Sequence, residues 1–136
     1  MTVKFAYDLV GGSYFGKVFR PVAKVSFQSP VHKLWVDTWM IVDTGADFSI
    51  LPHFLTKDLS ISLEKDCIKE PMAGVGGDQN VFLCKKRIKA KIGNLQREIP
   101  LAFFDNDEVP ALLGRLGFLE TFDVEFLKSH QVIFNS

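Results

Sequence analysis

The chain has no surplus of charge of one sign. Its 136 residues include 16 lysines and arginines and 16 aspartates and glutamates. A protein that follows a phosphate backbone or an anionic membrane surface needs an excess of positive charge. We therefore expect neither nucleic acid nor a membrane as its partner.

Cysteine and histidine are scarce. Cys67 and Cys84 are the only thiols, and the three histidines are scattered along the chain. Zinc sites need Cys and His at close spacing, and small secreted domains need more cysteines for a disulfide framework. We expect no metal and no cofactor.

Long apolar runs and repeats are absent as well. No segment approaches the ~18 apolar residues that a membrane-spanning helix needs. The first residues, with Lys4, Tyr7 and Asp8, lack the continuous apolar core of a signal peptide. No linker-like stretch divides the chain. These absences predict a cytoplasmic protein with a single domain.

The chain has enough apolar residues to form a core. Their spacing along the sequence is mostly typical of strands. Apolar residues make up 47% of the sequence, and 13 of them are Phe. Alternation and turn residues predict strands over residues 3–7, 21–27, 34–42, 67–72, 81–85, 88–92, 99–104, 124–126 and 132–134. Helical spacing occurs once, at Leu116, Leu119 and Phe122. We predict an all-β domain with one short helix, residues 114–122, near its C-terminus.

Three hairpins are expected among these strands. Residues 21–27 pair with 34–42, and residues 124–126 pair with 132–134. A third hairpin joins 88–92 to 99–104, because Gly93-Asn94 supplies the positive φ of a tight turn.

The most informative segment is VDTGADFSILP, residues 42–52, which places an acid between an apolar strand and a glycine turn. A carboxylate at such a bend can face a cleft, with the following backbone N–H groups as donors. Gly45 removes a Cβ from this close approach, and Thr44 adds a hydroxyl. Asp43 is therefore the candidate catalytic residue.

Asp43-Thr44-Gly45-Ala46, after two apolar residues, resembles the catalytic loop of the retroviral-type (retropepsin-like) aspartic proteases. Three further segments agree in the order of that family. Residues 73–77, AGVGG, resemble the tip of its flap, the hairpin that closes over substrate, and residues 111–115, ALLGR, resemble its Gly-Arg signature. Arg20-Pro21 before an alternating strand also fits. The likeness covers residues 20–136 and leaves 1–19 as an N-terminal extension.

The resemblance implies a closed retropepsin-like barrel and an aspartic endopeptidase that acts on a polypeptide. It assigns catalysis to Asp43, Thr44 and Gly45, and structural support to Arg115, which pairs with Asp47. The residues that it implies in substrate binding are Ala46, Asp47, Phe48, Gly74, Val75, Gly76, Gly77 and Leu112.

The chemistry independently calls for two carboxylates. Peptide hydrolysis without a metal or a nucleophilic side chain requires one group that takes a proton from water and another that gives one. Two neighbouring carboxyl groups that share a proton can do both. The nearest echo of the motif, Val36-Asp37-Thr38-Trp39, has an indole in place of glycine, so Asp37 is interpreted as an exposed residue. The second carboxylate must come from another copy of the chain, which predicts a homodimer.

Other interpretations stay open at this point. The chain could be a catalytically silent dimerisation or peptide-binding module of the same fold, or an enzyme that cleaves only its own extension. The glycine-rich tip could be a simple tight turn; it lacks the Gly-Lys-Ser/Thr end of a nucleotide loop.

The two cysteines have positions that a flap hairpin would relate. If that hairpin is centred between Val75 and Gly76, Cys67 and Cys84 lie opposite each other across it. They could form a disulfide at the base of the flap. The favoured interpretation is two reduced thiols that act as small apolar side chains.

Overall fold

The fold is known from a computed structural model that describes residues 1–74 and 77–136. The strands are β1 (Thr2–Ala6), β2 (Asp8–Ser13), β3 (Gly16–Arg20), β4 (Val22–Gln28), β5 (Trp35–Val42), β6 (Ser49–Leu51), β7 (Cys67–Gly74), β8 (Gly77–Cys84), β9 (Ile88–Ile92), β10 (Leu95–Ile99), β11 (Leu101–Phe104), β12 (Leu112–Leu113), β13 (Asp123–Leu127) and β14 (Gln131–Asn135). The helical elements are α1 (Leu55–Leu59), α2 (Leu63–Asp66) and the 3-10 helix η1 (Leu119–Thr121). The prediction of a mostly β protein is confirmed.

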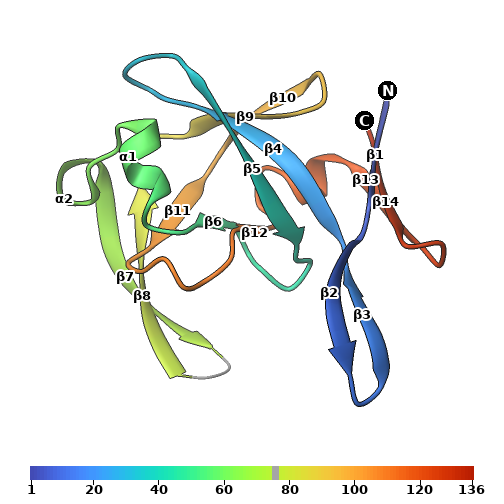
Figure 1. The fold of residues 1–136 in the computed structure, drawn as a ribbon. Helices are drawn as coiled ribbons and strands as arrows, with labels where there is room; N and C mark the ends of the chain where they lie inside the picture. Colours follow the sequence, from blue (N-terminus) through green and yellow to red (C-terminus); the bar gives the residue numbers. More distant parts are fainter. Residues whose placement is uncertain (75–76) are drawn as a thin grey trace.

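The strands form three sheets (Figure 1). The largest has the order β10-β9-β4-β5-β12-β6-β11-β8-β7, a second has the order β1-β14-β13, and β2 pairs only with β3. The order of the largest sheet begins at β10 and ends at β7, and within residues 1–74 and 77–136 no ladder joins these edges into a closed barrel.

The β4–β5 hairpin at the centre of the large sheet follows from its alternating sequence. Ala23, Val25 and Phe27 are buried, whereas Lys24 and Ser26 point away from the core. Side chains of a strand alternate between the two faces of the sheet, so one face of β4 can be entirely apolar. The predicted pairing of this hairpin is confirmed, with β4 antiparallel to β5 along its whole length.

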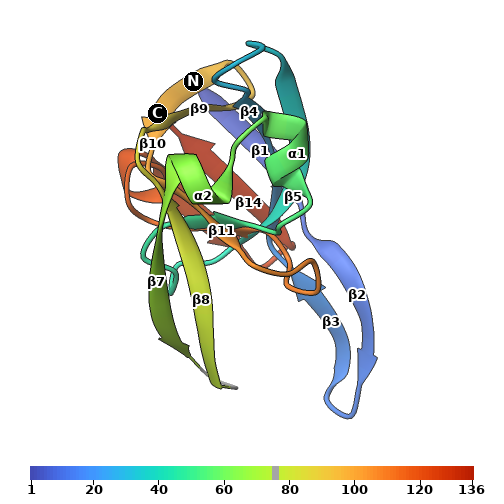
Figure 2. The ribbon, with the colours of Figure 1, turned by 90° about the vertical axis from the view of Figure 1, so that its left-hand side faces the viewer.

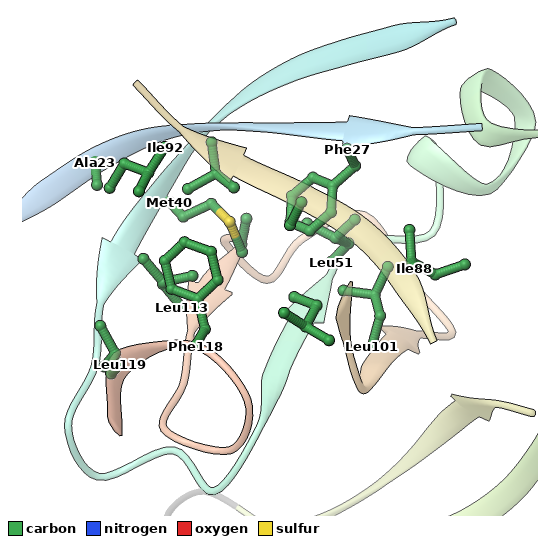
Figure 3. Packing of buried hydrophobic residues seen from close by; sticks show 14 of the residues in the cluster. Ala23, Phe27, Met40, Leu51, Ile88, Ile92, Leu101, Leu113, Phe118 and Leu119 are labelled. Atoms are coloured by element: carbon green, nitrogen blue, oxygen red, sulfur yellow. The ribbon is translucent and has the colours of Figure 1, made fainter. Parts of the chain in front are cut away.

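The main core lies between this hairpin and the segments that follow it. Figure 3 shows side chains of β4, β5, β6, β9, β11, β12 and the η1 region gathered in one cluster. The labelled members are Ala23, Phe27, Met40, Leu51, Ile88, Ile92, Leu101, Leu113, Phe118 and Leu119. Burial of these side chains supplies most of the hydrophobic driving force, roughly 25 cal/mol for each Å² of apolar surface removed from water.

Both termini contribute to one sheet. β14 pairs antiparallel with β13, as the sequence predicts for the last hairpin, and also with β1. Phe134 of β14 is fully buried and lies edge-on between Phe5 and Phe122, with ring centroids 6.2 Å and 5.9 Å away. Residues 1–19 thus contain β1, which is built into the sheet of the C-terminal strands, and β2.

The predicted helix over residues 114–122 is present only as a three-residue 3-10 helix. This segment forms turns followed by the short η1, and the α-helices are α1 and α2 in the middle of the chain. Gly117 adopts a left-handed conformation with φ +70°, which interrupts an α-helix, and Leu116 is 47% exposed instead of facing the core. The helical spacing of the apolar residues was therefore coincidental.

Two strand assignments also need correction. The hairpin turn at Gly93-Asn94 is present, but β9 pairs with β10, Leu95–Ile99, so that only Ile99 of the predicted partner strand 99–104 lies opposite it. Pro100 separates β10 from β11, which pairs with β6 and β8 instead. In addition, the sequence predicted no strand between residues 7 and 21, where the structure has β2 and β3. Gly11 lies at a register shift within β2, where its φ of +146° accommodates the irregularity.

None of the helices in the described part of the chain has the length and apolar character that a membrane crossing requires.

The terminal sheet generates a stability prediction. Replacing Phe134 with Ala removes a fully buried ring and should lower the free energy of unfolding by about 3–5 kcal/mol. Phe126 on the paired strand β13 is 44% exposed, so Phe126→Ala should cost no more than about 1 kcal/mol. Urea unfolding of both variants at one protein concentration measures the difference. Equal losses would show that Phe134 does not have the core position described.

Candidate active site

Asp43 lies at the start of the loop that joins β5 to β6, here called the Asp43 loop (residues 43–48). Its side chain is partly buried, and its Oδ1 accepts a hydrogen bond from the Gly45 N–H at 2.9 Å. The Ala46 N–H donates to the Asp43 carbonyl oxygen at 3.1 Å, which closes a tight turn. The backbone therefore fixes the direction of the carboxylate.

The short strand β12 holds this loop from behind. It lies between β5 and β6, with Leu113 in parallel register with Val42 and Leu112 in antiparallel register with Ile50. The Asp43 N–H donates to the Leu113 carbonyl at 3.0 Å. A segment some seventy residues further along the chain thus sets the position of Asp43.

Gly114 makes the closest approach between the two segments. A Cβ at this position would lie 2.3 Å from the Phe48 carbonyl oxygen and 2.4 Å from its carbon. The Gly114 N–H donates to the buried hydroxyl of Ser49 at 3.0 Å. Sequence reasoning assigned no role to Ser49. The signal for it was a serine inside an otherwise apolar stretch, where a hydroxyl needs a hydrogen-bond partner.

Asp47 and Arg115 form the predicted ion pair. The Arg115 Nη2 lies 2.6 Å from Asp47 Oδ1, and the two side chains are 49% and 71% exposed. An exposed pair contributes about 0–1 kcal/mol to stability. Backbone bonds reinforce it, because the Arg115 and Leu116 N–H groups donate to the carbonyls of Ala46 and Asp47 at 3.0 Å and 2.8 Å. The pair orients the loop more than it stabilises the fold.

The predicted flap corresponds to the long antiparallel hairpin β7–β8. Its register places Gly74 opposite Gly77, so these two residues flank the tip. Val75 and Gly76, which the sequence also assigns to substrate binding, lie outside the described residues.

A small apolar cluster lies between the base of this hairpin and the Asp43 loop. Its buried members come from β6, β8 and β11, and the partly buried side chains that pack on it include Phe48, Leu112, Met72 and Leu83. Val42, by contrast, belongs to the main core and is 5% exposed. Phe48 and Leu112 therefore remain available to a ligand, whereas Val42 does not.

The structure brings the remaining predicted residues together. Thr44, Gly45, Ala46 and Asp47 follow Asp43 in the same loop, with the Thr44 and Gly45 positions exposed. A Cβ at Gly45 would lie 3.3 Å from Asp43 Oδ1, so a larger residue would crowd the carboxylate.

The second Asp-Thr segment, residues 36–39, lies outside the Asp43 loop. Asp37 is on β5, where it is exposed as predicted and contacts the hydroxyl of Ser26 and, at 3.8 Å, the amine of Lys24. It has no connection to the Asp43 loop through these contacts.

The chemistry that this arrangement offers is that of a carboxylate oriented by one backbone N–H donor, that of Gly45. Within residues 1–74 and 77–136, no group of three or more His, Cys, Asp or Glu side chains gathers as metal ligands would. Such a carboxylate can take a proton from water when it is ionised and give one when it is protonated.

The two cysteines lie opposite each other at the base of the β7–β8 hairpin, as the predicted register requires. Cys67 pairs with Cys84, and both are free thiols with sulfur atoms 3.8 Å apart. Burial raises the pKa of the Cys67 thiol, and burial together with the neighbouring Cys67 raises the pKa of Cys84. A raised pKa lowers the fraction of thiolate at neutral pH and so lowers reactivity.

Gly114 generates the first prediction for this site. Gly114→Ala should lower the free energy of unfolding by about 1–3 kcal/mol, because the new methyl group meets backbone atoms of Phe48 that cannot rotate away. Gly12→Ala is the matched control, since nothing lies within 4 Å of a Cβ built there. Chemical denaturation measures both. A Gly114→Ala variant as stable as Gly12→Ala would contradict the close packing.

The two thiols generate the second prediction for this site. At pH 8 the native protein should react with iodoacetamide more slowly than the urea-unfolded chain at both Cys67 and Cys84, with the larger slowing at Cys84, since a raised pKa lowers the fraction of thiolate. The native rate should rise with pH. Peptide mass spectrometry without reduction measures the sites separately. A Cys67–Cys84 disulfide in the isolated protein would contradict the prediction.

Comparison with known proteins bears on the fold. No family model and no curated protein sequence matches the chain. Among solved structures, the fold is similar to the crystal structure of a retropepsin-like aspartic protease from Rickettsia conorii, with a TM-score of 0.64. The two are 17% identical, and the match covers 98% of each chain. The fold of this chain is thus that of a retropepsin-like aspartic protease over nearly its whole length.

Proposed function

We propose that the chain is an aspartic endopeptidase that acts as a homodimer, with Asp43 of each copy forming one catalytic pair. The observation that carries this proposal is the Asp43 loop itself. One carboxylate is oriented by the Gly45 N–H, supported from behind by β12 and flanked by a long hairpin, in a fold shared with a retropepsin-like aspartic protease. Each feature can be explained otherwise alone, but together they match the requirements of peptide hydrolysis.

The two carboxyl groups divide the chemistry. At a separation of a few ångströms they share one proton, because two ionised carboxylates would repel each other. The ionised member takes a proton from a water molecule while the water oxygen bonds to the peptide carbonyl carbon, and the protonated member gives its proton to the carbonyl oxygen. The carboxyl group that received the water proton then gives it to the amide nitrogen, while the other carboxylate takes a proton from a hydroxyl of the tetrahedral intermediate. The C–N bond breaks, an amine and a new carboxyl group form, and the pair again holds one proton.

The proposal of a dimer follows from the need for a second carboxyl group beside Asp43. Asp37 cannot serve as the second carboxyl group, since it lies on β5 with Ser26 and Lys24 as its partners. A twofold axis beside the Asp43 loop places the same residue of a second copy opposite the first. The exposed Thr44 would then face the partner's loop.

The substrate in this proposal is an extended polypeptide. The flap β7–β8 would cover it, and its backbone would add to the strands around the site in the manner of β-augmentation. Phe48 and Leu112 are partly exposed on an apolar cluster, so apolar substrate side chains next to the cleaved bond are favoured. Ala46, Gly74 and Gly77 offer backbone groups to the substrate without bulky side chains.

The test compares Asp43→Asn with Asp37→Asn. Incubation with a mixed peptide library from acidic to neutral pH should show cleavage by the wild type, lowered at least about 100-fold by Asp43→Asn because the shared proton is lost. Asp37→Asn should keep the wild-type activity, since this residue is exposed and remote from the loop's hydrogen bonds. Mass spectrometry identifies the cleaved bonds.

The pH profile and the state of association complete the experiment. Activity should follow a bell-shaped curve, because the pair must hold one proton. If the wild type and Asp43→Asn are equally inert at concentrations where sedimentation shows dimers, the silent peptide-binding module is the correct function.

A further inference from the structure

The β2–β3 hairpin, residues 8–20 and here called the β2–β3 arm, is the part of the molecule with the least support from the rest. β2 and β3 pair only with each other, and every residue of β2 is exposed. Figure 1 and Figure 2 both show the arm projecting from the body as a separate ribbon. A two-stranded hairpin alone in water is marginally stable at best.

Several apolar side chains of the arm are exposed to solvent. Tyr14 and Phe15 at the tip are 97% and 95% exposed, and Leu9 and Val10 on β2 are 52% and 46% exposed. The two rings at the tip contact each other edge-to-face, with centroids 5.4 Å apart. Exposed aromatic residues gathered in this way are typical of surfaces that another molecule covers.

The tip is nevertheless a defined turn. The Ser13 hydroxyl donates to the Gly16 carbonyl at 2.9 Å and accepts from the Phe15 N–H at 3.1 Å. Gly16 adopts a φ of +108°, which suits glycine. The turn therefore presents Tyr14 and Phe15 in a fixed arrangement.

The base of the arm is held firmly. The imidazole of His130, in the β13–β14 turn, stacks on Phe19 at 4.2 Å and on Tyr7 at 5.5 Å. The Tyr7 N–H donates to the His130 carbonyl at 2.9 Å. One residue beyond β3, the Pro21 carbonyl accepts a hydrogen bond from the Val42 N–H, next to Asp43. The direction of the arm is thus fixed relative to the catalytic loop.

The arm projects on the side of the molecule where the loop between β5 and β6 lies (Figure 1). In Figure 1 and in Figure 2 the arm and the flap β7–β8 project from the same side of the body. In Figure 1 the loop that links β5 to β6 lies between them. In the proposed dimer, a second copy whose Asp43 faces the first across a twofold axis would lie next to these two projections.

We propose that the β2–β3 arm is a dimer clasp, in which Tyr14 and Phe15 of each copy pack against the body of the other. The inference rests on the proposed function, because that function places the second copy opposite Asp43. Twofold symmetry makes the contact reciprocal, so each arm would bury its aromatic tip once. The clasp also accounts for a hairpin whose strands join no other sheet in the described part of the chain.

The first test is the strength of the dimer. The double variant Tyr14→Ser/Phe15→Ser should raise the dimer dissociation constant at least about tenfold, as loss of central aromatic contacts does. The control is Val31→Ser/Leu34→Ser, which removes two side chains that are 62% and 68% exposed in the segment between β4 and β5. This control should stay within about twofold of the wild type. Sedimentation equilibrium measures all three proteins, and circular dichroism shows that they fold.

The second test locates the contact. A benzoylphenylalanine placed at position 14 is irradiated in a mixture with isotopically labelled wild-type protein. Crosslinked peptides that join the unlabelled arm to the labelled chain are expected. Crosslinks confined to one chain, or none, in a sample that sedimentation shows to be dimeric would overturn the clasp.

The outcomes separate the clasp from the function on which it rests. If the wild type dimerises and cleaves peptides while the double variant keeps the same dissociation constant, only the clasp is wrong. If the double variant keeps that constant but loses cleavage, the arm contacts substrate and the clasp is again wrong. If the wild type is monomeric and inert at all concentrations, both proposals fail.

Discussion

Contact between the Asp43 loop and the strand β12 is the constraint on which the site depends. Leu113 accepts the hydrogen bond from the Asp43 N–H, and Ala46 accepts the one from Arg115. Gly114 permits the approach because its missing Cβ leaves room for the Phe48 carbonyl. Without this contact Asp43 would lie on an unsupported turn, and a carboxylate in a mobile turn could not hold the geometry that proton transfer needs.

The parts of the molecule around this contact have different roles. One face of the nine-stranded sheet supplies a core whose buried side chains come from many strands, so the loop rests on a rigid base. The smaller apolar cluster lies beside the loop and leaves Phe48 and Leu112 partly exposed. Binding and catalytic residues commonly stand on loops that a packed scaffold positions. In Figure 1 the two projecting hairpins stand on either side of that loop. In the proposals made above, the β7–β8 hairpin covers substrate and the β2–β3 arm contacts a second copy.

Much of this arrangement could be predicted from the sequence, where local patterns decide the structure. The alternation of Ala23, Val25 and Phe27 with polar residues predicted β4, and the symmetry of the flap hairpin predicted that Cys67 faces Cys84. The Asp47–Arg115 contact was predicted from the resemblance to a family. What could not be predicted depends on contacts between distant segments. Nothing local to Ser49 shows that its hydroxyl receives the Gly114 N–H.

The errors have physical causes of the same kind. The helix over 114–122 was predicted from apolar spacing, but the left-handed Gly117 breaks it. α1 and α2 were missed because helices of five and four residues are too short to show a period. The arm was not predicted because glycines such as Gly11 and Gly12 are uncommon inside strands, and Gly11 lies at an irregularity within β2.

The central claim is that one active site needs Asp43 from two copies, and mixing subunits tests it directly. Wild-type and Asp43→Asn chains are combined in varying proportions at constant total concentration, allowed to exchange, and assayed for peptide cleavage. The account predicts that activity follows the square of the wild-type fraction, so an equal mixture keeps about one quarter of the activity. An activity proportional to the wild-type fraction would show that each chain works alone and would contradict the account.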